Sequence, residues 1–129
     1  MEDALVQLRM TLDSLKDFQL ATVEKVIENL QQEGHSQRLL VADEVGLGKT
    51  IVAKGVIARL LMAWIQQYET GVVSRPMRVT YICSNLTLAA ENRQKLSVFG
   101  HIARERYVQE PSFSRLVELA VKPTQISNG

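Results

Sequence analysis

Glycine, lysine and threonine stand close together in one short run, Val45-Gly46-Leu47-Gly48-Lys49-Thr50, and this combination suits phosphate binding. Glycine can adopt positive φ and let the backbone approach an anion, so that successive N–H groups point toward a phosphate at a helix N-terminus. Lys49 would supply a mobile positive charge for the β- and γ-phosphates, and the Thr50 hydroxyl would complete the coordination shell of Mg²⁺. The run therefore predicts a binding site for a nucleoside triphosphate and magnesium.

The residues on either side of this run predict a strand before it and a helix after it, which is the usual setting of a phosphate-binding loop. Leu39 to Ala42 is a short apolar segment typical of a strand covered on both faces, and an apolar helix is expected from about Lys49 to Tyr68. The general phosphate-loop pattern has a further glycine at the position of Asp43, so the match to that pattern is incomplete.

The longer run Ala42-Asp43-Glu44-Val45-Gly46-Leu47-Gly48-Lys49-Thr50 resembles motif I of superfamily-2 helicases, and most closely that of the Swi/Snf-type ATPases. In that family an Asp-Glu pair usually precedes the glycines. The resemblance implies the ATP-binding part of a DNA-dependent helicase or translocase, which would move along or remodel double-stranded DNA. It also implies the first of two RecA-like lobes.

A second segment, Leu15 to Val23, resembles the stretch upstream of motif I in superfamily-2 enzymes, where an aromatic-Gln pair opens a helix. The resemblance implies that Gln19, which follows Phe18, reads the adenine ring of ATP. A carboxamide can donate and accept hydrogen bonds at once, as an adenine edge requires. An exposed helical glutamine with no such role is the alternative.

A third segment resembles motif Ia of the same superfamily, in which a strand-to-helix turn holds a phosphate of the nucleic-acid backbone. Ser84, Asn85 and Thr87 have suitable neutral donors near a helix N-terminus, so they are candidates for nucleic-acid binding. Ordinary capping of the helix by Ser84 or Asn85 explains these residue types equally well.

The expected fold is α/β: a partial RecA-like, three-layer phosphate-loop fold with a short parallel sheet of about three strands flanked by helices. Hydrophobic periodicity predicts helices over 1–14, 17–32 and 49–68 and a further helix after Ser84. Runs rich in β-branched and apolar residues predict strands over 38–42, 78–83 and 115–121. Residues 1–14 would form an N-terminal extension and 15–121 the core of one domain, 1–129.

A complete catalytic set is missing from the sequence. Hydrolysis normally needs a second carboxylate site to hold magnesium and orient water, yet no aspartate occurs between residues 51 and 129. Glu118 is the only acid near a suitable place. The expectation is therefore an N-terminal fragment that ends before the Walker B (DExH) motif and the second RecA-like lobe, with little ATP hydrolysis alone. The alternatives are a small phosphate-loop kinase and a free-standing, non-catalytic nucleotide-binding protein.

Composition and charge place only broad limits on the class of protein and on its partners. The net charge is +1, but residues 1–44 carry four basic and nine acidic residues whereas 45–129 carry eleven and five. A mildly basic C-terminal part suits a nucleic-acid surface, although a solvated mixed surface gives the same balance. The single cysteine, Cys83, excludes an internal disulfide, and His35 and His101 show no metal-ligand spacing. A single cysteine fits a reducing, cytoplasmic setting best. No signal peptide or membrane span is recognisable.

Overall fold

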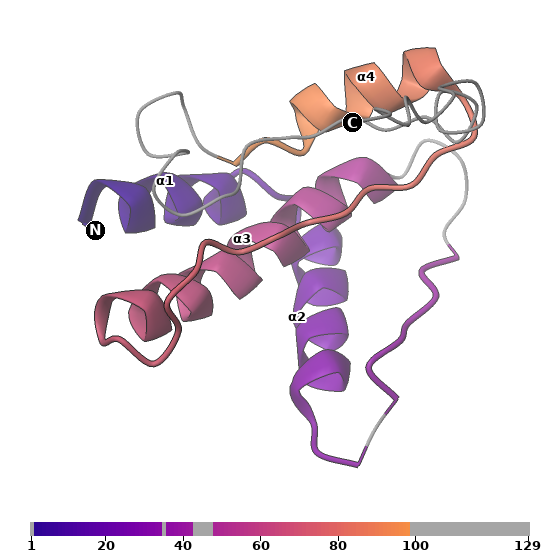
Figure 1. The fold of residues 1–129 in the computed structure, drawn as a ribbon. Coiled ribbons are helices and arrows are strands. Elements are labelled where there is room, and N and C mark those ends of the chain that lie inside the picture. The colour runs from indigo at the N-terminus through magenta and orange to yellow at the C-terminus, as the bar shows by residue number, and fades with distance from the viewer. Residues whose placement is uncertain (1, 35, 43–47, 99–129) are drawn as a thin grey trace, which may run out of the picture.

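A computed structural model describes residues 2–34, 36–42 and 48–98, and the described residues form four helices (Figure 1). They are α1 (Glu2–Asp13), α2 (Asp17–Gln31), α3 (Lys49–Glu69) and α4 (Leu86–Lys95). The longest, α3, is central, because α1 and α2 both pack against it and α4 also contacts it. None of these helices combines the length and hydrophobicity that crossing a membrane requires. The helices predicted from periodicity are confirmed.

The packing of α1 against α3 forms one of two hydrophobic clusters. Ala4 and Leu8 are one helical turn apart on α1, and they meet Ala58, Leu61 and Ile65 of α3. Leu8, Leu61 and Ile65 are each 0% exposed. Spacings of three and four residues place these side chains on one face of each helix, so the burial follows directly from the sequence period.

The second cluster lies where α2 crosses the N-terminal half of α3. It contains Leu15, just before α2, together with Val23, Ile27 and Val52. Gly55 makes this close crossing possible: a Cβ atom built on Gly55 would lie 2.7 Å from Cγ2 of Val23 and 2.8 Å from Cδ2 of Leu15. A glycine inside a helical pattern thus marks the contact point of two helices.

Replacing Gly55 with alanine is expected to lower the free energy of unfolding by up to about 2 kcal/mol, measured by urea denaturation. Overpacking a well-filled contact costs about 1–3 kcal/mol, and the gain in helix propensity returns about 1 kcal/mol of this. In a Val23→Ala background the same change should cost less, since Cγ2 of Val23, one of the two obstructing methyl groups, is gone. A stabilised Gly55→Ala protein would show that the two helices do not approach this closely.

The predicted α/β fold with a parallel sheet is wrong, because the described residues form helices and no β-strand. Residues 38–42 and 78–83 are neither helical nor paired into a sheet, and Figure 1 shows the second segment running past α3 without coiling. Leu40 is 86% exposed and Ile82 is 89% exposed. Apolar and β-branched residues favour an extended backbone, but a strand also needs partner strands that local sequence cannot supply. The third predicted strand, 115–121, lies outside the described residues.

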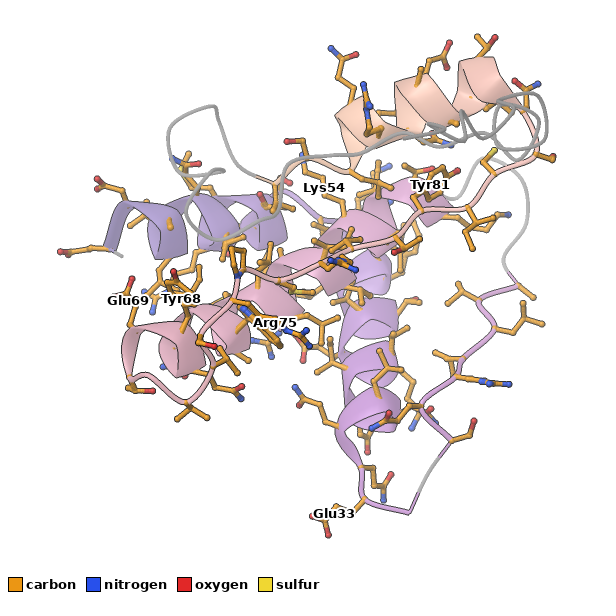
Figure 2. All side chains as sticks on the ribbon, viewed as in Figure 1. Glu33, Lys54, Tyr68, Glu69, Arg75 and Tyr81 are labelled. Atoms are coloured by element: carbon orange, nitrogen blue, oxygen red, sulfur yellow. The ribbon has the colours of Figure 1, made fainter. Side chains whose placement is uncertain are left out.

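The extended segment after α3 is nevertheless attached to the helices by side-chain hydrogen bonds. Nε1 of Trp64 donates to the backbone oxygen of Arg75 at 3.0 Å. Nδ2 of Asn92 on α4 donates to the hydroxyl of Tyr81 at 2.8 Å, and Figure 2 shows Tyr81 close to α4. Trp64 is half-buried and uses its N–H within the protein, as expected for a packing residue rather than a base-stacking platform.

Candidate phosphate-binding site

The start of α3 has one backbone feature of a phosphate site, a left-handed glycine directly before the helix. Gly48 is the N-cap residue, with φ 83° and ψ 42°, a left-handed conformation that favours glycine. Its carbonyl oxygen accepts the first helical hydrogen bond from the N–H of Val52 at 3.0 Å. The N-cap glycine has no side chain that could cap this helix. The N–H groups of its first turn and the positive end of its dipole therefore favour an anion.

Gln19, the predicted adenine-reading residue, lies directly against this turn. A Cβ atom built on Gly48 would be only 2.6 Å from Nε2 of Gln19. The carboxamide is almost completely buried, with 6% of the residue exposed, and its Oε1 accepts a hydrogen bond from the N–H of Lys16 at 3.0 Å. Gln19 thus joins the beginning of α2 to the beginning of α3, two points almost thirty residues apart in the sequence.

Gly48 consequently has two separate reasons to be glycine. Its positive φ strains any residue with a side chain, and the Gln19 carboxamide occupies the space where a Cβ would lie. The neighbouring Lys49 is exposed and Thr50 is half-buried, both in the first turn of α3. The other predicted residues of the phosphate loop, Val45, Gly46 and Leu47, lie outside the described residues.

A cavity of about 310 Å³ adjoins Lys49 but does not suit phosphate. It is lined by apolar side chains of α3, including Val52 and Val56, and by Val41 and Val79 of the two extended segments. Lys49, Thr80 and Tyr81 also line the cavity, but its surface is mostly apolar, whereas phosphate oxygens need several hydrogen-bond donors. The candidate position for an anion is therefore the helix terminus at Gly48 and not this cavity.

The residues predicted to contact nucleic acid gather at the start of α4. Oδ1 of Asn85 accepts hydrogen bonds from the N–H groups of Thr87 at 3.0 Å and Leu88 at 3.2 Å, so Asn85 is a typical N-cap. The alternative of helix capping thus accounts for the Asn85 side-chain oxygen. Ser84, Asn85 and Thr87 are all exposed. The starts of α3 and α4 lie toward the same side of the view in Figure 1.

The structural roles of two residues on α3 were not predicted from the sequence. Gly55 sets the distance between α2 and α3, and Arg59 of α3 forms an ion pair with Glu24 of α2, with Nη2 and Oε2 2.8 Å apart. The sequence signal in each case was an interruption, a glycine and an arginine inside an otherwise apolar helix. Such interruptions mark positions where a second element approaches.

Metal binding by the protein alone has no support in the described part of the chain. No group of three or more His, Cys, Asp and Glu side chains there could hold a metal ion. Magnesium would therefore need ligands from the nucleotide phosphates in addition to the Thr50 hydroxyl, which is the usual way in which Mg²⁺ is held beside a triphosphate. His35 and His101 lie outside the described residues.

Comparisons of the chain with protein-family models, with curated proteins and with solved structures found no match.

Proposed function

We propose that the chain binds MgATP, with the phosphates at the N-terminus of α3 and the adenine near Gln19. One observation supports this proposal: Nε2 of Gln19 lies against Gly48, so the residue proposed to read adenine adjoins the helix terminus proposed to hold the phosphates. Lys49 would neutralise the β- and γ-phosphates, and Thr50 would ligate Mg²⁺. The similarity to motif I of Swi/Snf-type ATPases supports ATP over other anions.

In this proposal the chain supplies the ATP-binding part of a cytoplasmic, DNA-dependent helicase or translocase. Double-stranded DNA and a further lobe of a full-length protein would be its partners. Support comes from the motif I residues and from the Gln19–Gly48 contact, and it does not depend on the parallel sheet, which the described residues lack.

A non-catalytic nucleotide-binding protein is the second candidate. The observation that favours it is the lack of any aspartate from residue 51 to residue 129, which leaves the magnesium-holding carboxylate unassigned. Both candidates predict that the purified chain releases almost no phosphate from ATP, with or without DNA, in a phosphate-release assay. Robust DNA-stimulated turnover would contradict both.

Replacing Gln19 with alanine tests the adenine part of the proposal. The variant is expected to lose affinity for ATP by about tenfold, and to lose less affinity for GTP, because an adenine edge is read by hydrogen bonds that guanine does not match. Titration of fluorescent ATP and GTP analogues would measure the two affinities. Gln19→Glu is the conservative variant, because it keeps the oxygen that accepts from the Lys16 N–H and loses the amide donor.

Equal loss of ATP and GTP affinity in Gln19→Ala would give Gln19 a structural role only. It would then position Gly48 and cap α2, without reading the base. Circular dichroism of both variants separates this result from unfolding, because a protein that keeps its helical signal and loses ATP and GTP affinity equally is folded but has a displaced phosphate site.

A further inference from the structure

A second cavity, of about 270 Å³, lies where α1, α2 and α3 meet, and it differs in character from the cavity beside Lys49. Each helix contributes long polar side chains: Arg9 from α1, Gln31 from α2, and Arg59 and Gln66 from α3. The α3 residues are seven apart and so lie on one face of that helix. Apolar side chains, including Leu5 and Met62, complete the walls.

The charge in this cavity is positive. Its lining holds two guanidinium groups and, among the described residues, no aspartate or glutamate. Glu24 lies outside the lining and pairs with Nη2 of Arg59 at 2.8 Å, which balances part of one charge. Nε of Arg59 is buried and has no hydrogen-bond partner in the described part of the chain. This Nε is closed to solvent, so an anion in the cavity would be met by the terminal N–H groups of Arg59 and by the guanidinium group of Arg9.

We propose that this cavity binds a small aliphatic carboxylate. Guanidinium groups match the planar pair of carboxylate oxygens, and the glutamine amides can donate further hydrogen bonds. The apolar walls would cover a short alkyl chain, which a free phosphate ion lacks. A volume of about 270 Å³ is below the usual range for drug-sized ligands, so the ligand would have only a few carbon atoms.

This site is separate from the proposed ATP site. Arg59 follows Lys49 by ten residues on the same helix, which corresponds to about 15 Å along the helix axis. The two proposals can therefore fail independently, because ATP affinity and carboxylate affinity are measured with different ligands and with different variants.

Isothermal titration calorimetry of the full chain with three probes tests the proposal: isovalerate, its neutral analogue isovaleramide, and inorganic phosphate. Isovalerate is expected to bind with a Kd of about 1 mM, as its small size allows. Isovaleramide and phosphate should bind at least about tenfold more weakly, since one lacks the charge and the other lacks the alkyl group. No saturable isovalerate binding in the millimolar range, or equal binding of either other probe, would overturn the proposal.

Arg9→Met removes one guanidinium while keeping an apolar stem, and Arg93→Met on α4 is the matched control at an exposed arginine outside the cavity. Arg9→Met should weaken isovalerate binding by about tenfold, and Arg93→Met should leave it unchanged. Neither should alter the affinity for an ATP analogue. Unchanged isovalerate affinity in Arg9→Met would also overturn the proposal. The probe comparison on the unmodified chain gives a result even if Arg9→Met fails to fold.

Discussion

Lys49→Ala is expected to lower the affinity for a fluorescent ATP analogue by about 10- to 100-fold in the presence of magnesium. A charge-assisted hydrogen bond contributes about 1.5–3 kcal/mol, and each 1.4 kcal/mol corresponds to a factor of about ten in Kd. Lys49 is exposed in the first turn of α3, beside the left-handed Gly48, so its ammonium group can reach an anion at that helix terminus. Fluorescence titration measures the effect.

Lys54→Ala is the matched control for this prediction. Lys54 stands on the same helix, five residues further along, and carries the same charge (Figure 2). Its removal should change the affinity for the ATP analogue by less than about threefold, because a charge away from the phosphates contributes only through screened, longer-range attraction. Equal losses in the two variants would indicate a general charge effect, and unchanged affinity in Lys49→Ala would exclude the phosphate site.

Leu61→Ala is expected to lower the free energy of unfolding by about 3–4 kcal/mol, because deleting buried methyl groups also leaves a cavity. Leu61 is 0% exposed and lies in the cluster that joins α1 to α3. Urea denaturation monitored by circular dichroism gives the value. Since a small domain is stable by only about 5–15 kcal/mol, this single change removes much of that stability.

Leu40→Ala is the matched control, because Leu40 is 86% exposed. Exposed substitutions of this kind usually change stability by less than about 0.5 kcal/mol. A small effect at Leu61, comparable with that at Leu40, would show that the α1–α3 cluster is not the core of the folded chain.

Helices could be predicted from the sequence because their signal is local. Val23, Ile27, Leu61 and Ile65 recur at the helical period, and each is buried in the structure. The sheet was predicted wrongly, because strand formation depends on partner strands elsewhere in the chain, and local residue types do not reveal whether those partners exist. Leu40 and Ile82 have residue types that favour strands, yet both are mostly exposed and unpaired in the described part.

Part of the candidate site could be predicted, and its residues were identified on two different grounds. Gly48, Lys49 and Thr50 were identified from their residue types and spacing, and Gln19 from a family resemblance; the structure places Gln19 against Gly48. Asn85 illustrates the limit, since one residue type serves both helix capping and phosphate binding, and its side-chain oxygen caps α4. The cavity around Arg59 could not be predicted, because it exists only once three helices are packed together.

Amide NMR spectra recorded during a titration with MgATP test the central claim most directly. If ATP phosphates bind where Gln19 meets Gly48, the backbone signals of Gly48, Lys49 and Thr50 and the side-chain amide of Gln19 should all shift as the site fills. AMP, which lacks the β- and γ-phosphates, should shift the first-turn signals of α3 much less. Shifts confined to other parts of the chain, or no saturable shift at the start of α3, would contradict the account.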